Sequence, residues 1–212
     1  MLMFDAVIFD LDGTLIDTEV LNQAAGVEAF AQCGITIEAA FLHALIGKDD
    51  ESGAHIIRAA FPQIDFAAYE ANWFAAVGRN YAAGIPLKPG ALALLAQTKL
   101  AKALATSSTR AQADHKLAIT GIGAHFQHII TFDDVERAKP APDPFLLAAR
   151  LLGVAPARCL VFEDSELGAE AAFCAGMTVV QIPDIIPASG RFAHLVAPDL
   201  LTGARGIGLI LD

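Results

Sequence analysis

The sequence predicts an α/β protein, a doubly wound parallel sheet with an inserted α-helical domain. Three observations lead to this prediction. Short apolar runs that end in a polar residue recur along the chain, helical stretches separate most of them, and a long stretch after the first run contains no convincing strand. Continuous apolar runs are typical of strands buried on both faces, and their alternation with helices predicts βαβ units.

The first apolar run covers residues 6–9 and ends in Asp10, and four later runs have the same character. Each is shorter than an ordinary helix, so a strand is the better interpretation. The five predicted strands are 6–9, 101–105, 128–130, 159–162 and 178–182.

Proline and glycine mark the helices expected between these strands. Pro89 and Pro144 lie at first-turn positions, where the missing N–H of proline costs nothing. Gly121, Gly153 and Gly176 follow the last helical residues, a position that favours a left-handed cap. The predicted helices are 89–100, 110–119, 144–152 and 166–175.

The stretch between the first two strands is far longer than the crossover of about a dozen residues that a parallel pair requires. Its pattern indicates four helices, over residues 18–33, 38–46, 50–61 and 66–83. We therefore expect two domains, an α/β core of residues 1–16 and 88–212 and an α-helical cap of residues 17–87.

The composition excludes several classes of function. Fourteen basic residues stand against 24 acidic ones, for a net charge of −10, and no basic run exists to neutralise a nucleic acid. No apolar run reaches the roughly 18 residues of a membrane span. The charged residue Asp5 interrupts the first residues before they could form the apolar segment of a signal peptide. Cys33, Cys159 and Cys174 form no paired framework, so we expect a soluble, cytoplasmic protein with reduced thiols.

Acidic residues follow two of the predicted strands. Asp10 and Asp12 come after the first strand, and Glu163 and Asp164 after the fourth. Open α/β sheets bind ligands at the carboxyl ends of their strands, where these side chains would meet. An isolated Asp-x-Asp pair is more often a turn and a helix cap, but a second acidic pair favours a shared cation. Oxygen ligands of this kind suit Mg²⁺.

Hydroxyl groups and a lysine follow the other strands. Thr106 and Ser107 come after the second strand, and Lys139 lies in the loop after the third. Taken alone, Thr106 is equally well explained as a helix cap and Lys139 as a solvated loop residue. Together with Asp10 as a nucleophile and a hard cation, they form a site suited to phosphoryl transfer, because each neutralises or hydrogen-bonds a phosphoryl oxygen.

These residues occur in four motifs that resemble those of the haloacid dehalogenase superfamily. The motifs are Asp10-Leu11-Asp12-Gly13-Thr14, Thr106 in Ala-Leu-Ala-Thr-Ser-Ser, Lys139 in Ala-Lys-Pro-Ala-Pro-Asp, and Phe-Glu-Asp-Ser with Glu163 and Asp164. They stand in the family's order and the resemblance covers essentially the whole chain. It is a resemblance to the Mg²⁺-dependent phosphatases that carry a helical cap after the first strand.

The resemblance implies a role for each residue. Asp10 would attack phosphorus and form an aspartyl-phosphate, while Asp12 would protonate the leaving alkoxide and later deprotonate the hydrolytic water. Thr106 and Lys139 would bind the phosphoryl group. Independently of the resemblance, the backbone amides of the turn at Ser107 are expected to form an anion-binding concavity beside them. The Mg²⁺ ligands that the resemblance implies are Asp10, the backbone carbonyl of Asp12, and Asp164, with Glu163 nearby.

Asp12 favours a phosphatase over a dehalogenase, because a leaving alkoxide needs a proton and a leaving halide does not. Within the phosphatase branch the chain is similar to β-phosphoglucomutase and to small sugar-phosphate phosphatases. Asn22 stands where the mutase has a histidine, and the loop of residues 46–50 lacks the mutase's arginine. We therefore expect hydrolysis of a small phosphorylated metabolite, with a phosphosugar mutase as the alternative.

Two further alternatives are functions without catalysis. A phospho-receiver domain also combines acids, a hydroxyl and a lysine at strand ends, but its phosphorylated Asp lies on a later strand and it has no helical insert. A catalytically inactive binding protein would not be expected to keep the complete set of acid/base and metal residues.

The cap is expected to select the substrate, because the core residues contact only the phosphate. Lys48 is the principal candidate for a contact with the leaving group, with Asp49 and Asn22 beside it. Lys48 and Asp49 are equally well explained as solvated loop residues. We favour a monomer.

Overall fold

The computed structural model describes residues 4–45 and 50–211. The chain divides into two compact units, the first of Met1–Asp17 and Pro86–Asp212 and the second of Thr18–Ile85. Asp17 and the two residues after Ile85, which the sequence analysis assigned to the helical insert, lie in the first unit. The reason is that the two connecting segments bond to one another: the Asp17 N–H donates to the Pro86 carbonyl at 2.8 Å, and Leu87 forms a β-bridge with Ile16.

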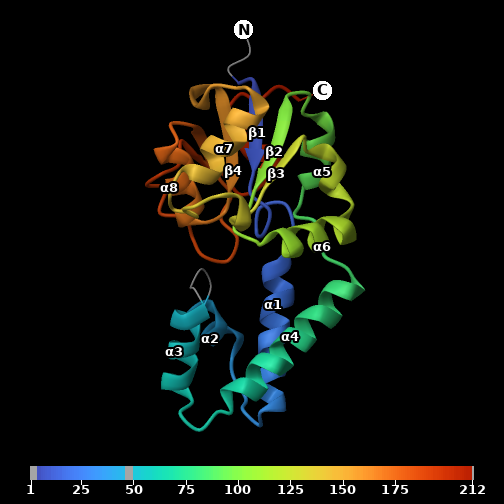
Figure 1. Ribbon diagram of the computed structural model, residues 1–212, viewed down its shortest axis with the longest axis vertical. Coiled ribbons are helices and arrows are strands. Elements are labelled where there is room, and N and C mark those ends of the chain that lie inside the picture. Colours follow the sequence, from blue (N-terminus) through green and yellow to red (C-terminus); the bar gives the residue numbers. More distant parts are fainter. Residues whose placement is uncertain (1–3, 46–49, 212) are drawn as a thin grey trace. The chain divides into compact units, whose positions relative to one another are not determined.

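The first unit is built on a six-stranded parallel sheet of order β3-β2-β1-β4-β5-β6 (Figure 1). The five predicted strands are present, and the sixth was not predicted because two residues carry too little pattern. The strands are β1 (Ala6–Phe9), β2 (Ala101–Ala105), β3 (His128–Ile130), β4 (Cys159–Glu163), β5 (Thr178–Gln181) and β6 (Leu195–Val196).

The central strand β1 is buried on both faces, as its continuous apolar run predicts. Phe9, its last residue, is paired with Leu104 of β2 and with Phe162 of β4, and its ring stacks on that of Phe162 at 5.4 Å. This register brings the ends of β1, β2 and β4 to the same level. The residues that follow these three strands therefore meet at one edge.

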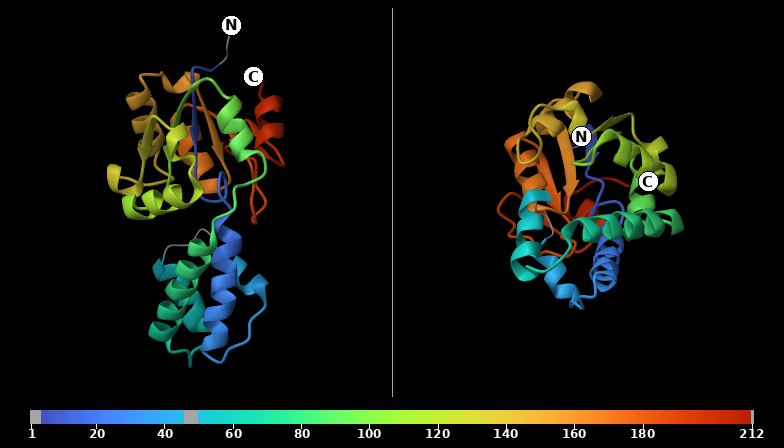
Figure 2. Two further views of the ribbon diagram at one scale, coloured as in Figure 1. Left: turned by 90° about the vertical axis from the view of Figure 1, so that its right-hand side faces the viewer. Right: turned by 60° about the horizontal axis from the view of Figure 1, so that its bottom comes forward.

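Helices cover both faces of the sheet, so the doubly wound α/β fold is confirmed (Figures 1 and 2). Helices α7 and α8 pack on the face formed by Ile8 and Val161, where small side chains such as Ala148 and Ala172 allow close approach. The helices are α5 (Ala91–Gln97), α6 (Arg110–Thr120), α7 (Asp143–Leu152), α8 (Glu166–Cys174) and α9 (Leu200–Gly206), with 3₁₀ turns η1 (Ile122–His125), η2 (Phe132–Asp134) and η3 (Pro156–Arg158).

The second unit is entirely helical over its described residues. Its helices are α1 (Thr18–Gln32), α2 (Ala39–His43), α3 (Asp50–Ala60) and α4 (Phe66–Ala83). Phe30 is fully buried at the centre of an aromatic cluster, 4.6 Å from Tyr69 and 5.2 Å from Phe61 between ring centroids. This unit thus has a hydrophobic core of its own. Across residues 4–45 and 50–211, no helix has the length and apolar character needed to cross a membrane.

Candidate active site

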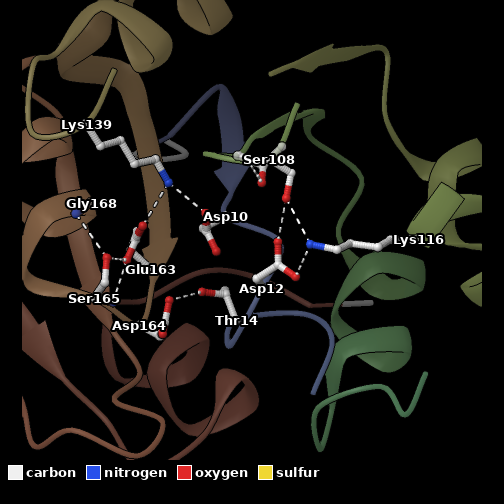
Figure 3. A network of polar contacts seen from close by, with 11 residues as sticks. Asp10, Asp12, Thr14, Ser108, Lys116, Lys139, Glu163, Asp164, Ser165 and Gly168 are labelled. Carbon is white, nitrogen blue, oxygen red and sulfur yellow. Dashed lines mark hydrogen bonds and ion pairs between the residues drawn. The ribbon is translucent and has the colours of Figure 1, made fainter. Parts of the chain in front are cut away.

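The strand order places a topological switch point between β1 and β4. The chain leaves β1 for β2 and β3 on one side and returns to β4 on the other, so the connections diverge at the carboxyl ends of β1 and β4. Ligands bind at such a switch point in open α/β sheets. Asp10 follows β1, Glu163 ends β4, and both lie in one network of polar contacts (Figure 3).

Lys139 bridges the two strand ends. Its Nζ lies 2.7 Å from Asp10 Oδ1 and 2.8 Å from Glu163 Oε1, and the three side chains are 5%, 8% and 1% exposed. The ammonium also lies 5.0 Å from the ring centroid of the buried Phe145. A lysine this deeply buried is held by its ion pairs, so the interpretation of Lys139 as a solvated loop residue is wrong.

Three carboxylates gather around this lysine. Oxygen atoms of Asp10, Glu163 and Asp164 lie within 4.8 Å of one another. Burial raises the pKa of Asp10 to about 7, with Lys139 opposing and Glu163 adding to the increase. Burial also raises the pKa of Asp164 well above its usual range, and the charges of Glu163 and Asp10 add to this. For Lys139, burial works to lower the pKa, but Asp10 and Glu163 raise it above its ordinary value.

This donor set fits a divalent cation of the Mg²⁺ type. Its three carboxylates carry more charge than one lysine neutralises, and the cluster offers only oxygen ligands. The residues that could hold such a cation in this geometry are Asp10, Asp164 and Glu163. The Asp12 carboxylate is not part of this group, so only its backbone carbonyl remains as a candidate ligand.

Two glycines make room for the acidic side chains. Gly13 has φ of 81°, and a Cβ at this position would lie 2.7 Å from Cγ of Asp164. A Cβ at Gly168 would overlap the carboxylate of Glu163. Thr14, which follows Gly13, donates its hydroxyl to Asp164 Oδ1 at 3.3 Å. The Gly-Thr of the first motif thus shapes the space around Asp164.

Glu163 is held from a second side by the start of α8. Its Oε2 accepts hydrogen bonds from the N–H and the hydroxyl of Ser165, at 2.6 and 2.8 Å. The same hydroxyl caps α8 by accepting from the Gly168 N–H at 3.1 Å. The orientation of Glu163 therefore depends on the N-terminus of this helix.

Asp12 lies in a separate set of contacts, with two partners that the sequence analysis did not identify. Its Oδ1 is 2.6 Å from Lys116 Nζ, and its Oδ2 accepts from the Ser108 hydroxyl at 2.9 Å. The signal for Lys116 was its spacing, since it shares the buried face of α6 with Ala113 and Leu117. A lysine on such a face requires a polar partner.

The two predicted phosphate-binding residues after β2 differ in their surroundings. Thr106 is buried, and its Oγ1 accepts from the Ser108 N–H at 3.1 Å, whereas Ser107 is exposed. The interpretation of Thr106 as the cap of α6 is wrong, because Thr109 caps that helix.

The candidate substrate residues belong to the second unit. Asn22 lies in α1, where its Oδ1 accepts from the Tyr81 hydroxyl at 3.0 Å. Lys48 and Asp49 lie outside the described residues.

Comparison with known proteins agrees with this fold. Residues 4–176 match the haloacid dehalogenase-like hydrolases. Fructose-1-phosphate phosphatase YqaB of Escherichia coli is 33% identical, with 84% of this chain and 96% of that protein covered. A structure from Thermotoga maritima, assigned as a β-phosphoglucomutase, is 27% identical with a TM-score of 0.80, and the match covers 92% of this chain and 94% of the other.

A third relative is a much longer protein. SUPPRESSOR OF QUENCHING 1, chloroplastic, of Arabidopsis thaliana is 33% identical over 84% of this chain, and the match spans 18% of that protein's length. These matches agree with the parallel sheet and with the acidic cluster at its edge. The chain belongs to the haloacid dehalogenase-like hydrolase family. It is an enzyme, a phosphatase of that family.

Proposed function

We propose that this protein is a Mg²⁺-dependent cytoplasmic phosphatase that hydrolyses a small phosphorylated metabolite, a sugar phosphate or similar, through an aspartyl-phosphate on Asp10. The observation that carries the proposal is the cluster of buried Asp10, Lys139 and Glu163 side chains with half-buried Asp164 at the carboxyl ends of β1 and β4. The activity of the relative YqaB supports the substrate class.

The proposed reaction uses these side chains in two steps. An Asp10 oxygen attacks phosphorus, the bond to the leaving oxygen breaks, and Asp12 gives that oxygen its proton. Water then attacks phosphorus, Asp12 accepts the water proton, and phosphate leaves with Asp10 restored as a carboxylate. Lys139 and the Thr106 hydroxyl bind equatorial phosphoryl oxygens. Asp10, Asp164 and Glu163 would hold a Mg²⁺ ion, which would supply charge stabilisation for the phosphoryl group.

Substitution of the two aspartates tests this assignment. Purified protein is expected to hydrolyse p-nitrophenyl phosphate only with Mg²⁺, and Asp10→Asn is expected to abolish turnover with an unchanged circular dichroism spectrum. Asp12→Asn should still release nitrophenolate slowly but lose nearly all activity on alkyl phosphates, because only these need a proton on the leaving group. Turnover by Asp10→Asn would eliminate it as the nucleophile.

The second unit is proposed to act as a cap that selects the substrate. Lys48, Asp49 and Asn22 are the candidate contacts, and alanine at each should raise KM for a sugar phosphate and leave p-nitrophenyl phosphate hydrolysis unchanged. Exposed Lys99 of the first unit provides the control, as Lys99→Ala. Equal effects on both substrates would argue against a specificity role.

A phosphosugar mutase is the second candidate, favoured by the likeness to the T. maritima structure. A panel of phosphometabolites with Mg²⁺, including β-glucose 1-phosphate with a bisphosphate activator, distinguishes the two. Release of inorganic phosphate supports the phosphatase, and an isomeric sugar phosphate without phosphate release supports the mutase.

A further inference from the structure

Lys116 is a buried lysine directed at the edge of the active site. It is 9% exposed and lies on α6 between buried Ala113 and Leu117. Its Nζ donates to Asp12 Oδ1 at 2.6 Å and to Ser108 Oγ at 2.9 Å (Figure 3). Because burial of an unpaired ammonium is strongly unfavourable, these contacts are what keep Lys116 in place.

Ser108 binds the second oxygen of the Asp12 carboxylate. Its hydroxyl accepts from Lys116 and donates to Asp12 Oδ2 at 2.9 Å, so each oxygen of the Asp12 carboxylate has a donor. A carboxylate held at both oxygens has little freedom to rotate. The Ser108 N–H also donates to Thr106 Oγ1 at 3.1 Å, which links the same turn to the phosphate-binding hydroxyl.

The helix that carries Lys116 is itself anchored. A capping box between Thr109 and Gln112 begins α6, and the guanidinium of Arg110 donates to the Ile129 carbonyl at 2.8 Å and to Asp134 at 2.6 Å. Groups presented from anchored helices are held more precisely than groups on loops. Lys116 is therefore a fixed donor to the Asp12 carboxylate.

We propose that Lys116 is a positioning residue, which holds the Asp12 carboxylate through their ion pair in the orientation that proton transfer requires. The proposal rests on the proposed function and adds a residue outside the four motifs. With an aryl phosphate the leaving group needs no proton, so Asp12 is required only when water attacks the aspartyl-phosphate. Loss of Lys116 should therefore slow the second step and spare the first.

Rapid-mixing kinetics with p-nitrophenyl phosphate and Mg²⁺ test this prediction. Lys116→Met is expected to release one equivalent of nitrophenolate per active site in a burst, followed by steady-state turnover reduced by about tenfold or more, with little change in burst rate. Lys116→Arg should recover part of the lost turnover, and Lys99→Met, at an exposed lysine, should behave as wild type. A purely structural role would slow both steps together and leave no burst.

A double variant tests whether Lys116 acts through Asp12. Asp12→Asn with Lys116→Met is expected to be no slower than Asp12→Asn alone, because the two residues serve one step. If Lys116→Met does not fold, Ser108→Ala, which removes the donor to Oδ2, should produce the same burst. An unchanged kcat in whichever single variant folds would overturn the positioning role of Lys116. So would a double variant whose loss of turnover equals the product of the two single losses. Neither result would contradict the proposed phosphatase activity. Absence of Mg²⁺-dependent turnover in the wild type would overturn both proposals.

Discussion

Glu163 is 1% exposed, and both of its oxygens have donors: Lys139 on one side and Ser165 on the other. No side chain fits where Gly168 approaches this carboxylate, since a Cβ there would overlap it. Gly168 lies five positions after Glu163 in the sequence, and its lack of a side chain leaves the space that the Glu163 carboxylate occupies. Glycine is therefore required at position 168 because any side chain there would collide with the Glu163 carboxylate.

Gly168→Ala is expected to displace Glu163 and, through it, Lys139, because the added methyl group occupies the position of the carboxylate. Mispositioning in an active site of this kind costs roughly 100-fold in rate, so kcat with p-nitrophenyl phosphate should fall by about that factor. Gly78→Ala is the matched control, since nothing lies within 4 Å of its Cβ, and it should retain full activity. Full activity in Gly168→Ala would contradict the crowding argument.

Among the helices, α9 shows how a cap that the sequence analysis did not identify stabilises an element. Asp199 precedes the helix, and its carboxylate accepts from the Thr202 N–H at 2.8 Å and from the Thr202 hydroxyl at 2.7 Å. These two hydrogen bonds hold the pKa of Asp199 below its usual range, with burial opposing them weakly. The cap therefore stabilises the folded protein chiefly when the Asp199 carboxylate is ionised.

Asp199→Ala is expected to lower the free energy of unfolding by about 1 kcal/mol at neutral pH through loss of this cap. Because the folded pKa is depressed, the ionic part of the stabilisation is present above the unfolded pKa of about 3.9 and is lost as the pH falls through the folded pKa. Urea unfolding followed by circular dichroism should therefore give a smaller difference between wild type and variant at acid pH. A difference that grows on acidification would refute this sign.

The whole molecule has a net charge of −10, and three of its carboxylates, those of Asp10, Glu163 and Asp164, lie together in the candidate site. Burial and the neighbouring carboxylates raise the pKa of Asp164, so its ionised form costs stability at a pH above its folded-state pKa. A bound cation would remove this cost and make the mouth of the site less negative toward an anionic substrate. Metal binding and stability are thereby coupled.

Mg²⁺ is expected to raise the melting temperature of the wild type, since a ligand at a hundredfold its Kd stabilises the folded state by about 2.7 kcal/mol. Asp164→Asn should melt at a higher temperature than the wild type without metal and respond less to Mg²⁺. Asp143→Asn, at an acid paired with Arg137 outside the cluster, should keep the wild-type response. Thermal melts with and without Mg²⁺ measure both effects, and an equal Mg²⁺ shift in Asp164→Asn would argue against Asp164 as a ligand.

Local pattern was sufficient for much of this molecule. Continuous apolar runs predicted the five longer strands, and strand ends followed by Asp10, Thr106 and Glu163 predicted the edge at which they lie, because parallel strands share one direction. The two-residue β6 and the seven-residue α9 were not predicted, since such short elements form through packing against β5 rather than through their own periodicity.

Sequence pattern alone was enough to predict the α/β class, the helical insert and the acids, lysine and threonine of the candidate site, because strand burial and motif order depend on neighbouring residues. The contacts of Lys139 with Asp10 and Glu163 could be identified only in the folded chain. The same is true of the contacts that Lys116 and Ser108 make with Asp12. These pairs join residues up to 129 positions apart, and their contacts exist only after the strands and α6 have packed.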